Sequence, residues 1–153
     1  MDKIDNKHIV KIGIVVHDIE SVAKRYGALF QIDPPTVKTP DPTKIAAEGT
    51  YKLYHGENRK ILLKSCIVNL DPIYLEIVEP YDDTPSPWLD YLNKFGPGVC
   101  FISFYIHDFE FHKDLMEKGG YPLAFIEEKG FERYAYFDTQ EKLGVTIEMK
   151  ERD

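Results

Sequence analysis

Ile-Gly-Ile-Val-Val-His-Asp-Ile-Glu at residues 12–20 is matched by Ile-Ser-Phe-Tyr-Ile-His-Asp-Phe-Glu at residues 102–110. The two stretches share His-Asp-x-Glu at an offset of 90, from position 17 to position 107. Each is a short apolar run followed at once by charged residues, which is the pattern of a buried strand that turns into a helix. Asp18 and Asp108 can accept hydrogen bonds from the first helical turn. The repeat predicts two half-domains of one design.

Each half also ends on a strand-like run that contains glutamate. These runs are Ile-Tyr-Leu-Glu-Ile-Val-Glu-Pro at residues 73–80 and Gly-Val-Thr-Ile-Glu-Met-Lys-Glu at residues 144–151. A carboxylate inside a β-rich run is costly to bury unless it is paired or used. Glu76 and Glu148 are therefore the candidate functional residues.

The bulk composition is that of a globular domain. The chain has 153 residues, 43% of them hydrophobic and 29% charged, with a formal net charge of −7. This balance predicts one domain over residues 1–153 and argues against a nucleic-acid or anionic-membrane partner, because both need clustered Lys and Arg. No apolar run reaches the length of a membrane span and the first residues lack an apolar signal region, so we expect a cytoplasmic protein.

The order of expected elements predicts an α+β fold made of two tandem βαβββ modules. The Pro-rich segment 34–44 interrupts the first module and is either a ligand-contacting arm or a plain surface excursion. Ser86-Pro87 opens a short helix, because Ser is a good N-cap and Pro suits the first helical turn. The expected boundaries are residues 8–80 for the first module, 81–98 for a linker with this helix, and 99–150 for the second module.

The residues quoted above, with Gly-Pro-Gly at 96–98 and Tyr-Phe-Asp-Thr at 136–139, resemble the vicinal oxygen chelate superfamily. That superfamily contains glyoxalase I, methylmalonyl-CoA epimerase, bleomycin-resistance proteins and extradiol dioxygenases, and the chain looks most similar to its epimerase and glyoxalase (lactoylglutathione lyase) branch. The resemblance implies a cup-shaped, mostly antiparallel mixed sheet. It also implies a divalent metal that holds two substrate oxygens while a carboxylate moves a proton, and a homodimer as in many relatives.

Carried over position by position, the implied ligand set is only half kept. The two last-strand ligands fall on Glu76 and Glu148, but the two first-strand positions, normally His, fall on Lys11 and Phe101. Two carboxylates without imidazole or thiolate are a poor transition-metal site. We therefore expect no tightly bound metal. A site that keeps a metal through Glu76, Glu148 and a further His is the remaining alternative.

The sequence suggests a replacement for the metal. The Lys11 ammonium, on a strand adjacent to Glu76, can neutralise one carboxylate and donate to a substrate oxygen. Glu148 is then the catalytic base, Glu76 its partner and Lys11 the cationic stabiliser. A structural ion pair without chemistry is the competing explanation. Phe101, Tyr74, Tyr136 and His55 are the expected substrate-binding residues.

The sequence is compatible with two functions. The first is a lyase, isomerase or epimerase that acts on a small oxygen-rich acid, thioester or ketone through an enolate-like intermediate. The second is a non-catalytic small-molecule-binding protein of the resistance type, whose cup needs shape and aromatic rings but no metal.

Overall fold

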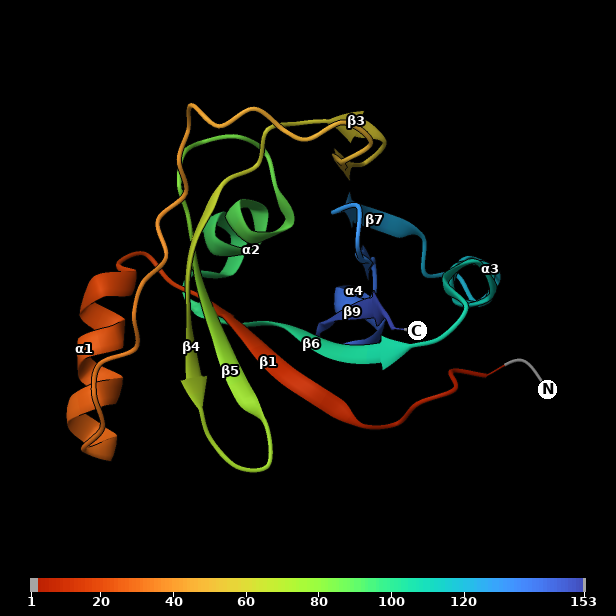
Figure 1. Ribbon diagram of the computed structural model, residues 1–153. Coiled ribbons are helices and arrows are strands. Elements are labelled where there is room, and N and C mark those ends of the chain that lie inside the picture. The colour runs from red at the N-terminus through yellow and green to blue at the C-terminus, as the bar shows by residue number, and fades with distance from the viewer. Residues whose placement is uncertain (1–2, 153) are drawn as a thin grey trace. The chain divides into compact units, whose positions relative to one another are not determined.

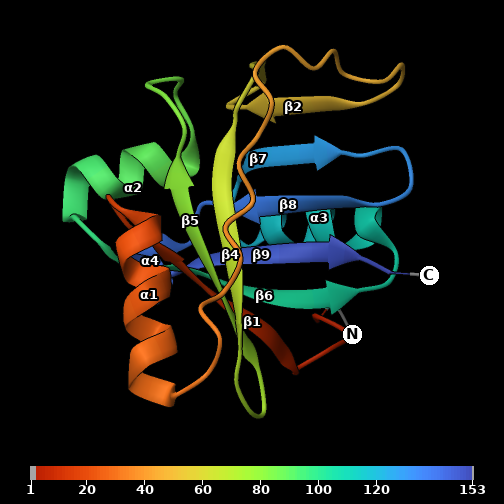
Figure 2. The same ribbon diagram turned by 60° about the vertical axis from the view of Figure 1, so that its left-hand side comes forward.

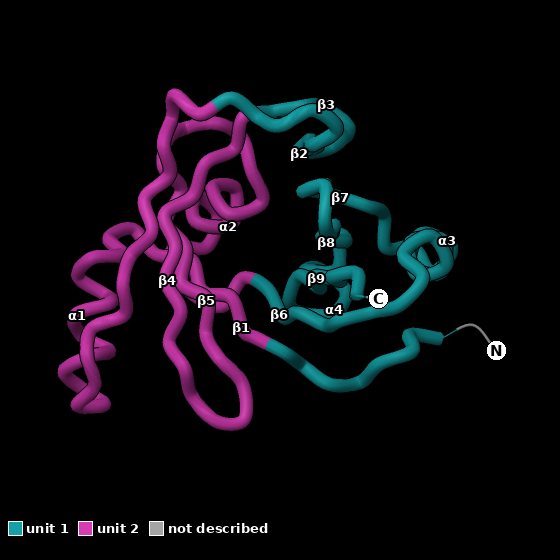
Figure 3. Tube along the Cα trace, viewed as in Figure 1, with its two compact units in different colours: residues 1–10, 45–59, 101–153 teal, residues 11–44, 60–100 magenta. Residues whose placement is uncertain are grey.

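The computed structural model describes residues 3–152 and divides into two compact units. Unit 1 comprises residues 1–10, 45–59 and 101–153, and unit 2 comprises residues 11–44 and 60–100 (Figure 3). Both combine helices with parallel and antiparallel strand pairs, so the predicted α+β class is confirmed.

Unit 2 is a three-stranded sheet with helices. Strand β1 (Ile9–Val15) runs parallel to β5 (Tyr74–Pro80), and β5 runs antiparallel to β4 (Leu63–Asn69). Helix α1 (Ile19–Phe30) lies alongside these strands (Figure 1) and buries Ile19 and Ala23 against Cys66, Val68 and Ile77. The helix therefore covers one face of the sheet, and the alternate residues of β1 and β5 point to the other face. Helix α2 (Pro87–Phe95) follows β5.

Unit 1 contains the larger set of strands. Strands β2 (Tyr51–Tyr54), β7 (Leu123–Glu128), β8 (Arg133–Phe137), β9 (Thr146–Glu151) and β6 (Gly98–Ile106) lie side by side in that order, with the short β3 (Glu57–Asn58) beyond β2 (Figure 2). All pair antiparallel except β6 and β9, which are parallel. Helix α3 (Phe109–Lys118) buries Phe109 and Met116 against Ala135, Phe137 and Met149, and α4 (Gln140–Leu143) precedes β9.

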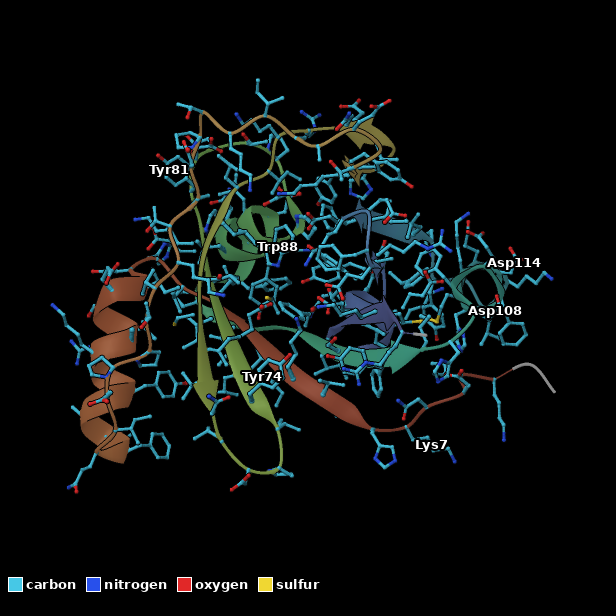
Figure 4. The ribbon with its side chains drawn as sticks, viewed as in Figure 1. Lys7, Tyr74, Tyr81, Trp88, Asp108 and Asp114 are labelled. Atoms are coloured by element: carbon cyan, nitrogen blue, oxygen red, sulfur yellow. The ribbon has the colours of Figure 1, made fainter. Side chains whose placement is uncertain are left out.

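The repeated His-Asp-x-Glu stretches do begin helices. The Asp18 carboxylate accepts from the Ser21 N–H at 3.2 Å, and the Asp108 carboxylate accepts from the Phe111 N–H at 3.1 Å. The two caps differ in backbone, because Asp108 has φ of 54° whereas Asp18 has φ of −135°. Figure 4 labels Asp108 at the start of α3. The capping prediction is confirmed, and the helix predicted from Ser86-Pro87 also forms, as α2.

One strand of the first half pairs with the second half. Strand β2 runs antiparallel to β7, in the register Tyr54 to Phe125. Contacts accordingly group residues 45–59 with unit 1, although the predicted first module ran from 8 to 80. The physical reason is side-chain packing, because Leu53 packs against the α3-covered core of unit 1. Strand spacing alone carries no information on this choice of partner.

Candidate functional site

Each unit carries one of the two candidate glutamates, and the surroundings of each are described separately. Glu148 is in β9 of unit 1, and Glu76 is in β5 of unit 2. Both occupy the sheet face away from the covering helix of their unit, since their neighbours Met149 and Ile77 lie in the helix-covered cores.

Glu148 is held in a transverse row of three side chains. In the sheet register it is the partner of Ser103 on β6 and of Tyr136 on β8. The Ser103 hydroxyl donates to Oε1 of Glu148 at 2.6 Å, and both residues are only 2% exposed. A buried carboxylate needs such a donor, because loss of its hydration is otherwise uncompensated. The hydrogen bond therefore fixes where the Glu148 carboxylate lies.

Aromatic rings surround this row. The Phe101 and Tyr136 ring centroids are 5.0 Å apart, and Phe125 and Tyr136 are 5.8 Å apart. Tyr134 continues the cluster at 6.0 Å from Tyr136. Such rings exclude water beside a carboxylate, and a small ligand can pack against them. Of the expected binding residues, Phe101 and Tyr136 thus lie with Glu148.

The same sheet face becomes polar towards the far ends of β8 and β9. The Tyr134 hydroxyl donates to Glu127 at 2.6 Å, and the Lys150 ammonium lies 3.3 Å from Glu132. Burial alone would raise the pKa of Glu132, but the ammonium groups of Lys150 and Lys129 lower it below its ordinary value. The face of unit 1 therefore runs from an aromatic region with a buried carboxylate to a region of paired charges.

Glu76 has an ammonium partner instead. The Lys11 Nζ lies 3.2 Å from Oε1 of Glu76, and the two side chains are 7% and 25% exposed. In the β1–β5 register the direct partner of Glu76 is Gly13, while the partner of Lys11 is Tyr74. Since glycine has no side chain, β1 places nothing directly opposite Glu76, and Lys11 reaches the carboxylate on the diagonal. The predicted adjacency of Lys11 and Glu76 is confirmed as an ion pair.

The other two expected binding residues are placed less centrally. Tyr74 begins β5 beside Lys11 (labelled in Figure 4), so it belongs to the Lys11–Glu76 face of unit 2. His55 lies in the exposed turn after β2 with φ of 50°, and its ring contacts that of Tyr54 at 4.2 Å. Its role as a binding residue stays a prediction.

The residues at the implied metal positions do not fit a divalent ion. Lys11 offers an ammonium, which repels a cation, and the Phe101 ring has no lone-pair donor. Within residues 3–152 there is also no cluster of three or more His, Cys, Asp or Glu side chains that could hold a metal. The four implied ligand positions therefore provide two carboxylates, Glu76 and Glu148, and no imidazole.

Cys66 packs on the α1-covered face of unit 2. Burial raises the pKa of its thiol to about 11, with smaller contributions from the charges of Glu20 and Glu76. Almost none of the thiol is ionised near neutral pH, so Cys66 behaves as a core residue and not as a nucleophile.

Three functional or structural residues were not singled out on the sequence. Ser103 is one, although it stands at an offset of 90 from Gly13 and so marks a difference between the repeats. The others are Glu79 and Glu151, which accept from the first helical N–H groups of α1 and α3, at Ile19 (2.9 Å) and Phe109 (3.3 Å). The repeated Glu-x-x-Glu runs, 76–79 and 148–151, were the available signal.

A family model described as the Glyoxalase/Bleomycin resistance protein/Dioxygenase superfamily matches residues 10–137, which is most of the chain. The chain belongs to this superfamily. The resemblance seen in the sequence is thereby confirmed. Glu148 lies beyond the matched residues, so its candidacy rests on the hydrogen bond and burial described above.

Several solved structures share the fold. The methylmalonyl-CoA epimerase of Mycobacterium tuberculosis superposes with a TM-score of 0.60 at 17% identity, over 95% of this chain and 87% of that chain. A variant of the Streptomyces coelicolor epimerase, in complex with 2-nitronate-propionyl-CoA, gives a TM-score of 0.61 at 18% identity, over 95% and 96%. A hypothetical protein from Bacillus halodurans gives 0.62 at 16% identity, over 95% and 94%. At these low sequence identities the similarity shows a shared fold and nothing more.

A comparison with curated protein sequences finds no match. Within the described residues, no helix has both the length and the apolar character needed to cross a bilayer.

Proposed function

We propose that the protein is an enzyme of the glyoxalase type that moves a proton on the carbon beside a carbonyl group, with Glu148 as the base. The substrate class is a small oxygen-rich acid, thioester or ketone. The observation that carries this proposal is the buried Glu148 carboxylate, held by Ser103 at 2.6 Å within an aromatic sheet face. Membership of the superfamily and the shared fold of the epimerases support it.

The chemistry follows from the carboxylate and its surroundings. Glu148 accepts the α-proton as the C–H bond breaks, and the electron pair of that bond moves into the carbonyl group to give an enolate. Protonation of the same carbon on its opposite face completes an epimerisation, and protonation of the neighbouring atom of the enolate system completes an isomerisation. Exclusion of water by Phe101 and Tyr136 favours this transfer, because a dry carboxylate is a stronger base than a hydrated one.

Lys11 and Glu76 are assigned roles as well. Lys11 is the cationic group that stabilises the developing oxyanion, and Glu76 is the carboxylate that holds it.

The test is exchange of the α-proton for deuterium, followed by NMR over a panel that includes methylmalonyl-CoA, 2-oxo acids and the glutathione adduct of methylglyoxal. We expect at least one panel member to exchange. Glu148→Gln should lower that rate at least about 100-fold while the melting temperature stays near that of the parent protein. Glu117→Gln, a carboxylate on α3 paired with Lys113, is the matched control. Equal rates for the parent protein and Glu148→Gln would end the proposal.

A binding protein without turnover is the second candidate, and the aromatic cluster is the observation in its favour. Phe101, Phe125, Tyr134 and Tyr136 form a continuous set of ring contacts that can hold a flat apolar ligand without any base. In that case Glu148→Gln keeps ligand affinity in calorimetric titrations, whereas Tyr136→Ala abolishes it. Under the enzyme proposal, Glu148→Gln keeps affinity but loses exchange.

A homodimer remains our proposal for the assembly. Light scattering during size-exclusion chromatography should give about twice the chain mass of 17.7 kDa. A mass of one chain at micromolar concentration would rule the dimer out.

A further inference from the structure

We infer that the Lys11 ammonium is a built-in cation that occupies the coordination space of Glu76, so that unit 2 rejects divalent metal ions. The inference deepens the proposed function, because it names the group that would meet a substrate oxyanion. Its test measures metal binding and therefore does not depend on turnover.

The first support is geometric. The Lys11 Nζ lies 3.2 Å from Oε1 of Glu76, within hydrogen-bond distance, and only 7% of the Lys11 side chain is exposed. A buried ammonium needs hydrogen-bond acceptors, and a carboxylate on the neighbouring strand is the strongest one that a side chain offers. The pair is therefore a fixed contact, unlike an exposed ion pair whose lysine exchanges between water and protein.

The second support is the strand register. Gly13 is the β1 residue opposite Glu76, and Tyr74 is the β5 residue opposite Lys11. A larger residue at position 13 would place its own side chain between the two charges. The Lys11–Gly13 combination thus permits the diagonal pair, and it occurs in β1 but not in β6, where Phe101 and Ser103 stand at the corresponding positions.

The third support is the donor set around Glu76. A divalent ion bound to Oε1 would lie within a few ångströms of a positive charge that is held in place, and it would be repelled. Oxygen and nitrogen ligands are also too few, since the described part of the chain gathers no three His, Cys, Asp or Glu side chains. A single carboxylate cannot compensate an ion for its lost hydration.

A metal ion chelates two neighbouring oxygens through coordination bonds, whereas the Lys11 ammonium binds oxygen only through its three N–H donors, one of which goes to Glu76. The fitting partner of Lys11 is a single anionic oxygen of a carboxylate or enolate. A pair of neutral vicinal oxygens would gain less from it.

The experiment compares metal binding by the parent protein, Lys11→His, Lys11→Gln and Lys11→Arg, with and without Glu76→Gln. Isothermal titration with Ni²⁺ and Co²⁺ at pH 8, together with melting temperatures, gives the affinity. We expect no stoichiometric binding by the parent protein or by Lys11→Arg. Lys11→His should bind Ni²⁺ at least tenfold more tightly than the parent protein, and Glu76→Gln should remove that gain. Lys11→Gln separates loss of the charge from gain of an imidazole.

Circular dichroism of each variant first establishes that it is folded. One ion per chain in the parent protein, with binding that is lost in Glu76→Gln, overturns the inference. It is equally overturned if folded Lys11→His and Lys11→Gln both bind no better than the parent protein. If a Lys11 variant does not fold, the parent protein and Glu76→Gln alone still decide the question. Failure of the Glu148 proposal would instead appear as unchanged proton exchange in Glu148→Gln.

Discussion

The two units place a glutamate at matching positions of their last strand but give it different partners. In unit 1 the direct neighbour of Glu148 is Ser103, whose hydroxyl donates to the carboxylate. In unit 2 the direct neighbour of Glu76 is Gly13. Lys11, two residues before Gly13, lies diagonally opposite Glu76 and donates to its carboxylate. One pair of alternate positions on the first strand therefore places a hydroxyl beside one glutamate and an ammonium beside the other.

This difference separates two kinds of site. A hydroxyl donates a hydrogen bond to a carboxylate without bringing a charge of its own. A carboxylate held by an ammonium is neutralised and serves mainly to keep that cation in place. Under the proposed function, the same fold unit carries a proton acceptor in one copy and an oxyanion partner in the other.

The largest expected effect is at Phe101, which stands where Lys11 stands in the other repeat. Phe101 is fully buried and packs on Tyr136, so Phe101→Ala should lower the free energy of unfolding by about 3–5 kcal/mol. Urea denaturation measures it. Phe131→Ala, at a site that is 82% exposed, is the control and should change stability by less than about 0.5 kcal/mol. A loss below about 1 kcal/mol at Phe101 would mean that the aromatic face of unit 1 is not tightly packed.

The next effect is at Ser103. Ser103→Ala removes a hydrogen bond to a buried carboxylate and should cost about 1.5–3 kcal/mol of stability, and Ser103→Thr should restore part of it. Chemical denaturation of the three proteins under the same conditions measures the difference. Equal stability of all three proteins would show that the Ser103 hydroxyl does not stabilise the buried Glu148 carboxylate. The contrast drawn between the two units would then not hold for unit 1.

The Lys11–Glu76 pair should give a smaller coupling. A double-mutant cycle with Lys11→Met and Glu76→Gln should yield an interaction free energy of about 1–2 kcal/mol, because the pair is largely buried. The control cycle uses Lys113 and Glu117 on α3, which are more exposed and should couple by about 0.3–0.5 kcal/mol. Coupling in the first cycle no greater than in the second would contradict a fixed cation in unit 2.

The smallest effect distinguishes the two helix caps. Asp108 has φ of 54°, a backbone conformation that glycine adopts without strain, whereas Asp18 has φ of −135°. Asp18→Gly should therefore cost a few tenths of a kcal/mol through loss of the cap, and Asp108→Gly should cost about nothing. Thermal unfolding of both variants and of the parent protein measures the difference. A larger loss of stability for Asp108→Gly than for Asp18→Gly would contradict the inference that the backbone at position 108 favours glycine.

Local sequence determined a large part of this fold. The strand-to-helix turns at Asp18 and Asp108, the Ser86-Pro87 helix start and the β-rich ends around Glu76 and Glu148 all follow from residues close in the chain. Helix caps and apolar periodicity act over a few residues, so they can be read from the chain directly. The 90-residue offset also predicted that Lys11 and Phe101 are counterparts.

Tertiary structure alone decided the partners. Nothing near residues 51–54 indicates that this strand pairs with β7, because either sheet edge offers the same backbone hydrogen bonds and the choice depends on where Leu53 is buried. Likewise, Ser103 became a partner of Glu148, and Glu79 and Glu151 became caps of α1 and α3, only through contacts between distant segments. The sequence determined which residues are the candidates for chemistry, and the strand register determined which of them meet, because side-chain contacts across a sheet depend on alignment and not on distance along the chain.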